Sequence, residues 1–369
     1  MDYSYWEDVL YSTQYDMIVV GAGIVGQSTA YFYKKEHPAA KVLVVDRGAF
    51  PIGASTRNAG FACIGTIGEH IADLEIESET AVKNRIVARF NGLNLLRKTL
   101  GDEAINYEDC GGWEIFTDEY EYELCAAQVP KFNQWMEELL GIEEMYKVGT
   151  YNNYPAIFNK VEGMLHPGKL IGRLHQMNID AGVEFRWNSL VKDVDLDSGV
   201  IFIDENISFK ATKVVLATNA FTKGLYTDNS IKPGRGYVIV TSAMDTLLWK
   251  GTFHFNKGYV YYRSLGEDKI LLGGGRNIDL LTEETSEFGI NESIKNYLVD
   301  FANDVLGLPT GWKIEREWSG IMGFTETKSP YLKQVGKCGL LVAGLSGMGV
   351  ALGMQLGKDA ASLVDELDA

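Results

Sequence analysis

The sequence predicts an α/β fold with two domains, one built on a parallel sheet and the other on a mixed antiparallel sheet. The chain has 369 residues, which is long for one hydrophobic core. Apolar strands run into glycine-rich turns that open helices near the start of the chain, at 16–26, and near its end, at 340–350. Between these two units, strand-like segments with a hairpin signal indicate an antiparallel sheet.

The first unit, at 16–46, has the parts of a Rossmann-like dinucleotide-binding βαβ motif in order. Gly21 permits the tight turn, Gly23 lets the backbone approach a pyrophosphate, and Gly26 lets helix and strand pack closely. The helix that begins here offers unpaired N–H groups to phosphates. Asp46 ends the second strand, twenty residues after Gly26, where it can accept hydrogen bonds from a ribose.

Residues 51–68 form a loop whose only charge is Arg57. A loop of this length without charge is unusual unless it wraps something, so it is either a buried connector or a segment that lies against a flat cofactor ring. Apolar residues at helical spacing then predict a helix over about 69–100. A helix near 168–181, a small β-meander and an apolar strand at 213–220 follow, and this strand ends in small residues, as sites at strand carboxyl ends do.

Residues 226–320 have a different character, with antiparallel strands expected at 236–241, 258–263 and 269–273 and a hairpin near 265–268. A polar helix is expected within 283–305. The chain then returns to an apolar strand at 340–343, a glycine-rich turn and a helix through Val364. This second glycine turn is hard to place in a nicotinamide dehydrogenase, and it makes sense if the last helix returns to the same cofactor.

Charge and cysteine usage exclude several classes of protein. The net charge of −16 argues against a nucleic-acid partner, because phosphate binding needs a basic surface. No apolar run of eighteen residues exists, so we expect no membrane span, and residues 1–15 lack the pattern of a secretion signal. The four cysteines are scattered, so we expect neither a metal site nor disulfides, and a reducing cytoplasm fits best.

Four segments together resemble the glycine/D-amino-acid oxidase (sarcosine oxidase-like) family of FAD-dependent oxidoreductases. They are the turn at 21–26 with Asp46 and Arg47, the loop 54–60, the strand 214–220 and the turn 344–350. The resemblance implies a discontinuous FAD-binding domain at 1–95, 151–225 and 320–369. It also implies an α+β substrate-binding domain at 96–150 and 226–319, whose mixed antiparallel sheet covers the flavin ring.

The resemblance also implies which residues bind FAD. Val191 contacts the adenine through its backbone, Ala217 and Thr218 approach the pyrophosphate, and residues 56–61 run along the flavin ring. The N-terminus of the last helix faces the pyrimidine end, where its free N–H groups stabilise negative charge. The expected cofactor-binding residues are Gly21, Ala22, Gly23, Ile24, Val25, Gly26, Asp46, Arg47, Ser55, Thr56, Arg57, Asn58, Ala59, Gly60, Phe61, Val191, Ala217, Thr218, Gly347, Met348, Gly349 and Val350.

The sequence departs from the family pattern at three places. Some relatives attach flavin covalently through a cysteine in the region that reads 318–325 here, which has none, so we expect non-covalent FAD. An arginine near the Met322 position binds the substrate carboxylate in glycine and D-amino-acid oxidases, and methionine cannot do so. Sarcosine oxidases have a lysine near the Leu271 position that promotes reaction with oxygen, and its absence weakens the case for an oxidase over a dehydrogenase.

The expected catalytic residues are Tyr259, Tyr261, Arg263 and Arg57. Tyr259, Tyr261 and Arg263 alternate along one strand and therefore share a face. Arg263 or Arg276 could hold a carboxylate in a bidentate pair, although a solvated strand end is equally expected for either arginine alone. His254 could accept a proton, but a histidine in an aromatic strand is more often structural, so it is left out of this set.

These observations predict oxidation of the C–N bond of a small amine or amino acid by hydride transfer to flavin N5, giving an imine that hydrolyses. The electron acceptor is O2 or an unknown partner. Two alternatives stay open, namely an FAD-dependent hydroxy-acid oxidoreductase and a flavin-binding module without turnover of its own. Ammonia release would favour the amine, and a keto acid formed without ammonia would favour the hydroxy acid.

Overall fold

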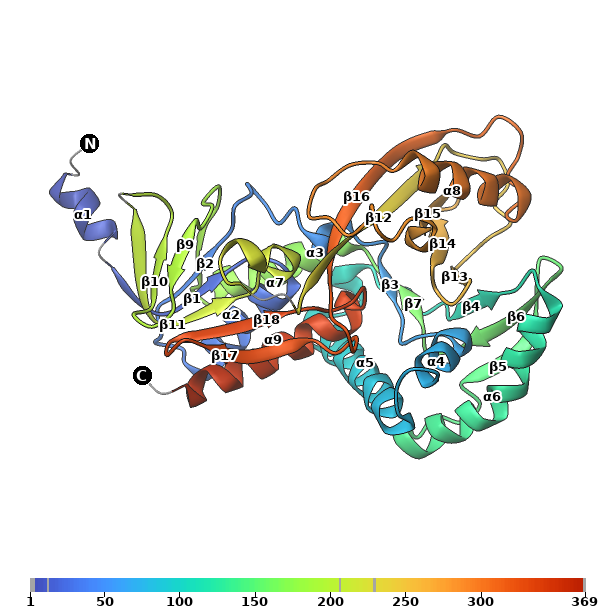
Figure 1. The fold of residues 1–369 in the computed structure, drawn as a ribbon, viewed down its shortest axis with the longest axis horizontal. Helices are drawn as coiled ribbons and strands as arrows, with labels where there is room; N and C mark the ends of the chain where they lie inside the picture. The colour runs from blue at the N-terminus through green and yellow to red at the C-terminus, as the bar shows by residue number, and fades with distance from the viewer. Residues whose placement is uncertain (1–3, 12, 206, 228–229, 368–369) are drawn as a thin grey trace.

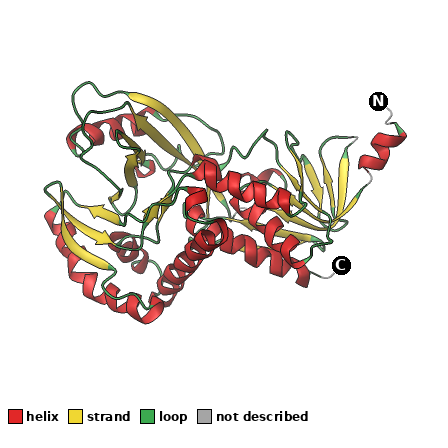
Figure 2. Cartoon of the chain, turned by 180° about the vertical axis from the view of Figure 1, so that it is seen from behind, coloured by secondary structure: helices red, strands yellow, loops and turns green. Residues whose placement is uncertain are grey.

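The computed structural model describes residues 4–11, 13–205, 207–227 and 230–367. Two eight-stranded sheets lie toward opposite ends of the long axis (Figure 1). Figure 2 shows helices packed between and below the two sheets, and a short N-terminal helix that stands apart from the body. Within the described ranges, no helix combines the length and the apolar character that crossing a membrane requires.

The first sheet contains the parallel strands that the glycine-rich motifs predict. β1 pairs in parallel with β2 on one side and with β11 on the other, and β18 continues the sheet beyond β11. This order places β1 where the strand sequence reverses, which is where ligands bind in open α/β sheets. In sheet order the strands are β17 (Tyr331–Val335), β18 (Gly339–Ala343), β11 (Ser208–Leu216), β1 (Gln14–Val20), β2 (Val42–Val45) and β8 (Glu184–Arg186), with β10 (Val200–Phe202) and β9 (Asp193–Asp195) joined through β11.

Two glycines of the first turn are required by backbone contacts. Gly21 has φ of +109°, and a Cβ there would come within 2.6 Å of the carbonyl oxygen of Ala217 at the end of β11. A Cβ on Gly26 would come within 1.9 Å of the carbonyl oxygen of Gly21. Only glycine therefore lets β1 turn directly into helix α2 while the helix stays close to the strand.

The second sheet is mixed, as the sequence predicts. Its central strands are antiparallel, the expected hairpin joins β14 to β15, and β13 pairs in parallel with β4. In sheet order the strands are β16 (Ile314–Phe324), β12 (Lys232–Thr241), β15 (Lys269–Gly274), β14 (Val260–Leu265), β13 (Thr252–Phe255), β4 (Gly112–Ile115), β6 (Tyr154–Asn159) and β5 (Tyr146–Tyr151). A small two-stranded sheet, β3 (Phe61–Ala62) with β7 (Gly163–Met164), lies between the two large ones.

The helices begin and end at recognisable caps. Ser78 accepts a hydrogen bond from the N–H of Ala81 to start α5, and Gly101 with φ of +83° ends it. His166 caps α7 in the same way, with Pro167 at its first position. The α-helices are α1 (Tyr5–Tyr11), α2 (Ile24–Glu36), α3 (Ala54–Arg57), α4 (Ile67–Leu74), α5 (Glu79–Leu100), α6 (Glu119–Leu140), α7 (Pro167–Asp180), α8 (Glu292–Asp304) and α9 (Gly349–Glu366).

The structure differs from the sequence prediction in several elements. The helix expected over 69–100 is two helices, because the Ser78 cap starts α5 anew after α4. The strand expected at 213–220 is continuous with the last strand of the expected meander: both belong to β11, which ends at Leu216 and bridges the meander and the parallel sheet. The polar helix is confined to 292–304. At the expected domain boundary at residue 151 the topology also differs, because β6 lies beyond it and still pairs with β4 in the second sheet.

Helix α9 returns from the far end of the chain to the first glycine turn. A Cβ on Gly353 would come within 2.6 Å of the Ile24 side chain, and one on Gly357 within 2.5 Å of the Ser28 side chain in α2. The two glycines therefore allow α2 and α9 to pack at close range. As a result, the N-termini of both helices open toward the same space.

Candidate active site

A cavity of about 1030 Å³ lies at the carboxyl ends of the parallel strands and extends across one face of the second sheet. The strands β1, β2 and β11 are each followed directly by residues that line it, and the last two residues of β18 line it as well, as the rule for open α/β sheets predicts. The predicted cofactor-binding residues that line the cavity are Gly21, Gly23, Ile24, Val25, Asp46, Arg47, Ser55, Arg57, Asn58, Ala59, Phe61, Val191, Ala217, Thr218, Gly347, Met348, Gly349 and Val350.

The first glycine turn forms a narrow cradle beside the N-terminus of α2. The hydroxyl of Ser55 accepts a hydrogen bond of 2.9 Å from the N–H of Ile24, the first residue of the helix. A Cβ on Gly23 would come within 3.0 Å of that hydroxyl oxygen. The absence of a side chain at Gly23 and the positive end of α2 together make a site for an anion such as a pyrophosphate.

Asp46 joins the glycine turn to the end of β2. Its Oδ2 accepts a hydrogen bond from the N–H of Ala22 at 2.8 Å, and its Oδ1 accepts one from the N–H of Gly48 at 2.9 Å. The neighbouring Arg47 lies over the ring of Phe221, with 3.8 Å between the guanidinium carbon and the ring centroid. Asp46, Arg47 and Phe221 line this end of the cavity, and Val191 lines it too.

The charge-poor loop wraps the cavity and is fixed to strand β16. Nη1 of Arg57 donates a hydrogen bond of 2.8 Å to the carbonyl oxygen of Ser319, and the indole N–H of Trp318 donates one of 2.9 Å to the carbonyl oxygen of Arg57. The guanidinium also lies 4.6 Å from the centroid of the Phe288 ring. Arg57 therefore connects the two domains, and its Nη1 already has a protein partner.

The C-terminal glycine turn approaches the cavity from the opposite side. Gly344 and Gly347 have φ of +85° and +88°, and helix α9 starts directly after Met348. The side-chain oxygen of Asn219 accepts a hydrogen bond of 3.1 Å from the N–H of Gly344. The first N–H groups of a helix have no intrahelical acceptor, so the start of α9 presents donors and a positive dipole end to the cavity.

The second sheet contributes an aromatic face. His254, Tyr261, Gly273 and Val238 lie directly opposite one another on the four neighbouring strands β13, β14, β15 and β12. The ring of Tyr261 covers Gly273, where a Cβ would come within 2.6 Å of it. The Phe61 ring contacts both Tyr261 and His254, with centroid distances of 5.6 and 5.2 Å. Burial raises the pKa of Tyr261 to about 12, so its phenol is neutral at physiological pH.

The two candidate arginines have different environments. Arg276 lines the cavity, and its guanidinium carbon lies 4.1 Å from the centroid of the Phe324 ring. Burial lowers its pKa, and the described residues provide no hydrogen-bond or ion-pair partner for its side chain. Arg263 is on the same face as Tyr261, but it is only 7% exposed and does not line the cavity. A Cβ on Gly60 would come within 3.4 Å of its guanidinium carbon, so the loop covers it.

Several predicted residues act from behind the cavity wall. Ala22, Gly26, Thr56 and Gly60 do not line it. The Thr56 hydroxyl donates to the carbonyl oxygen of Pro51 at 2.6 Å, and this bond holds the loop. Among the expected catalytic residues, Tyr259, Tyr261 and Arg57 line the cavity and Arg263 does not. Met322, at the position where the resemblance implies an arginine, also lines it.

Sequence reasoning missed a group of cavity residues on other elements. Asn219 is a non-glycine residue with positive φ, at +49°, three residues after the end of β11. An asparagine at a strand end is a detectable signal, because asparagine tolerates this conformation. Phe221 and Lys257 gave no comparable signal, since their positions depend on how distant segments pack.

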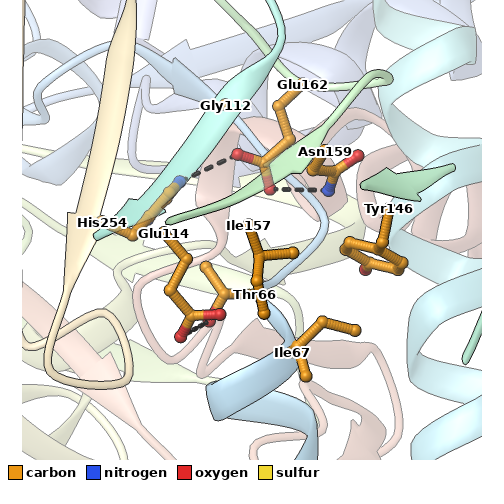
Figure 3. Close-up of a pocket in the computed structure, with 9 residues that line it drawn as sticks. All are labelled: Thr66, Ile67, Gly112, Glu114, Tyr146, Ile157, Asn159, Glu162 and His254. Atoms are coloured by element: carbon orange, nitrogen blue, oxygen red, sulfur yellow. Dashed lines mark hydrogen bonds and ion pairs between the residues drawn. The ribbon is translucent and has the colours of Figure 1, made fainter. Parts of the chain in front are cut away.

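A second, buried polar cluster adjoins the cavity (Figure 3). His254 Nε2 lies 2.8 Å from Oε2 of Glu162, and Oε1 of Glu162 accepts a hydrogen bond of 3.2 Å from Asn159. Glu114, beside His254 in the sheet, accepts hydrogen bonds from the Thr66 hydroxyl and the Gly68 N–H. Burial raises the pKa of Glu114 to about 7, although these two hydrogen bonds oppose the shift.

Known proteins share this architecture. A D-amino acid dehydrogenase of Helicobacter pylori is 22% identical over 403 residues, covering 94% of this chain and 94% of that protein. The structure of glycine oxidase from Geobacillus kaustophilus has a TM-score of 0.75 and 21% identity, and the match covers 97% of this chain and 96% of that one. L-proline dehydrogenase from P. horikoshii has a TM-score of 0.75 and 16% identity, with 97% and 95% covered.

These likenesses establish the fold, a Rossmann-like domain with a second domain on a mixed sheet. The cavity geometry fits FAD, because it combines a glycine cradle, two helix N-termini and an acid at the end of β2. The family described as FAD dependent oxidoreductase matches residues 16–363, which is nearly the whole chain. The chain therefore belongs to the FAD-dependent oxidoreductase family.

Proposed function

We propose that this chain is an enzyme that oxidises the C–N bond of a small amine or amino acid, with FAD bound non-covalently. The observation that carries the proposal is the composition of a single cavity. It has a dinucleotide cradle at one end and, at the other, the aromatic face of the second sheet with Arg276 beside it. A half-buried cation without a hydrogen-bond or ion-pair partner is costly unless an anion binds it, and a substrate carboxylate supplies that anion.

The residues that would hold FAD follow from the cradle. The N-terminus of α2 and Gly23 would bind the pyrophosphate, Asp46 the ribose, and the loop at 53–61 with the start of α9 the flavin end. FAD, when bound, supplies a two-electron acceptor for a hydride. The region 318–325 contains no cysteine, which supports non-covalent binding.

The protein's own contribution is positioning and exclusion of water. Arg276 would orient the substrate through its carboxylate, while Tyr259, Tyr261 and Phe61 form an apolar wall beside it. Fixed orientation in a dry pocket lowers the barrier without a strong base. The N–H groups at the start of α9 favour negative charge that develops near them.

The acidic wall near His254 favours an amine over a hydroxy acid. Glu162 lies directly behind the cavity there, joined to His254, and its negative charge attracts a substrate ammonium group; Glu114 beside it adds to this attraction where it is ionised. A hydroxy acid has no cationic group that this negative charge could attract. This contrast makes the amine the first candidate and the hydroxy acid the second.

The test is anaerobic mixing of the purified FAD-loaded protein with glycine, sarcosine, L-proline, D-alanine and the matching hydroxy acids. Loss of the flavin's visible absorbance with an amine, together with release of ammonia or an amine, is the expected result. Bleaching by hydroxy acids alone would establish the second candidate. A flavin that no compound bleaches would identify a binding module. Admitting air after bleaching then separates an oxidase from a dehydrogenase.

Arg276 has its own test. Arg276→Ala should lower kcat/KM for an amino acid by about ten- to a hundredfold, the value of a charge-assisted hydrogen bond, mainly by raising KM. Arg276→Lys should recover part of this loss, because the charge returns without the bidentate geometry. Arg263→Met is the matched comparison, since Arg263 lies under Gly60 and outside the cavity. A loss of substrate binding in that variant alone, with unchanged thermal stability, would show that Arg263 and not Arg276 binds the substrate carboxylate.

A further inference from the structure

His254 and Glu162 form a buried pair in the wall of the cavity. Glu162 is 1% exposed and His254 is 7% exposed, and the 2.8 Å contact joins His254 Nε2 to Oε2 of Glu162. Figure 3 shows the two side chains reaching toward each other from different segments of the chain. The other oxygen of Glu162 is held by Asn159. A Cβ on Gly112 would come within 2.1 Å of Oε2, so a glycine is needed to leave room for the carboxylate.

The histidine of this pair also faces the active site. His254 lines the large cavity together with Tyr261 and Phe61, whereas Glu162 lines only the small pocket behind it. That small pocket has no room for a water molecule. With Nε2–H donated to the Glu162 carboxylate, the neutral imidazole carries its lone pair on Nδ1. The described residues offer no hydrogen-bond partner for Nδ1.

Charges around His254 come from every neighbouring element. Burial is the largest single influence and would lower the pKa of His254, but the adjacent Glu162 carboxylate and the more distant acidic groups together outweigh it, and the pKa is raised from its ordinary value of 6.5. The contributions of Glu114 and Glu69 act in the same direction. The titratable groups near the imidazole are Glu162, Glu114, Glu69, Cys63 and Tyr261, and Lys257 lines the same cavity.

We infer that His254 is a catalytic residue that accepts a proton from the substrate ammonium group at Nδ1, and that Glu162 is the positioning residue that fixes its tautomer. The inference rests on the proposed oxidation of an amine. In this step one N–H bond of the ammonium group (R–NH3⁺, or R2NH2⁺ in sarcosine and L-proline) breaks, an Nδ1–H bond forms, and the electron pair of the broken bond stays on the neutral amine. The pair passes from a net charge of −1 to neutrality, so its base form first attracts the ammonium group that it then deprotonates.

The test follows the pH dependence of kcat/KM for the compound that bleaches the flavin fastest among glycine, sarcosine, L-proline and D-alanine. His254→Gln should lower kcat/KM by about a hundredfold or more near neutral pH, the usual contribution of a general base. The loss should shrink as the pH approaches the pKa of the free amine, because solution then supplies the deprotonated substrate. At low pH kcat/KM should fall as His254 becomes protonated, and this fall is the acidic limb of the pH profile. Glu162→Gln keeps the imidazole but removes the charge that raises its pKa, so the acidic limb should move to lower pH.

A second readout is independent of turnover. The chain has five histidines, so NMR of the holoenzyme with ¹⁵N-labelled histidine can assign His254 by its absence from His254→Gln. The titration midpoint of this imidazole should equal that of the acidic limb, and both should fall together in Glu162→Gln. The matched control is His70→Gln. His70 is equally buried and bonded to Tyr146 at 3.1 Å, but it does not line the cavity, so the acidic limb should stay unchanged.

Three results would overturn the inference. The first is a His254→Gln enzyme that keeps its acidic limb and its rate, and the second is a limb that does not follow the imidazole titration. The third is stoichiometric zinc that is lost in Cys63→Ser, because Cys63, Glu162 and His254 have ligand atoms within 4.8 Å of one another and would then be a metal site. If no amine reduces the wild-type flavin, the proposed function fails and this inference with it, whereas reduction with an unaltered limb in His254→Gln refutes this inference alone.

Discussion

Asp46 accepts at Oδ2 a hydrogen bond of 2.8 Å from the backbone N–H of Ala22, across 24 positions of the chain. The contact joins the end of β2 to the glycine turn after β1, and Oδ1 of the same carboxylate holds the N–H of Gly48. Asp46 therefore organises the cradle in addition to the ribose contact that its position predicts. This double role leads to the first prediction.

Asp46→Ala should weaken FAD binding by about ten- to a hundredfold, because it removes a charged acceptor that two backbone N–H groups share. The dissociation constant of FAD, measured by titrating the apoprotein, checks this. Asp16→Ala is the control. Asp16 also accepts a backbone hydrogen bond, from the N–H of Lys41 at 2.6 Å, but it lies at the opposite end of β1. Equal weakening in both variants would show that the effect is a general loss of stability.

Gly26→Ala should lower the melting temperature and abolish FAD binding, because its Cβ would overlap the carbonyl oxygen of Gly21 at 1.9 Å. Gly172→Ala should act in the opposite direction. Gly172 is exposed in the middle of α7 and has open space where a Cβ would be, so alanine should stabilise the helix by about 0.5–1 kcal/mol. Thermal unfolding of both variants decides the point, and a tolerated Gly26→Ala would contradict the cradle geometry.

The buried Glu114 carboxyl should make the free energy of unfolding fall as the pH rises from 4.5 to 7. Burial raises its pKa from the ordinary 4.5 to about 7, so in this range the folded protein binds more protons than the unfolded chain. The stabilisation is complete below pH 4.5 and is lost as the pH rises through 7. Melting temperatures at pH 5 and pH 8 should therefore differ less in Glu114→Gln than in the wild type. Glu267→Gln, with a side chain 89% exposed, should leave that difference unchanged.

FAD should leave the protein on acid precipitation and appear in the supernatant. Of the four cysteines, all free thiols, Cys63 lines the cavity, and burial raises its pKa well above the ordinary value. A neutral thiol is a poor nucleophile toward a flavin. Cys63→Ala should therefore retain the same amount of releasable FAD. Flavin that stays with the precipitated wild-type protein and is released from Cys63→Ala would show a covalent bond.

Local sequence signals predicted the parts of the fold that depend on neighbouring residues. The turns at Gly21 and Gly344 follow from glycine's access to positive φ, and each helix start follows from the turn before it. The division between α4 and α5 is equally local, since Ser78 is a standard helix cap, yet the continuous apolar pattern concealed it. The length of β11 was missed because its pairing with β10 and with β1 decides where the strand runs.

The sequence by itself determined the two glycine turns, the parallel strands that run into them, and the charge-poor loop that lines the cavity. It placed Arg263 and not Arg276 among the expected catalytic residues, whereas the tertiary structure covers Arg263 with the loop at Gly60 and leaves Arg276 in the cavity wall. The pairing of His254 with Glu162 joins residues 92 positions apart. Dihedral preferences and apolar periodicity act over a few residues, whereas burial and the partner of a charge are set by packing between distant segments.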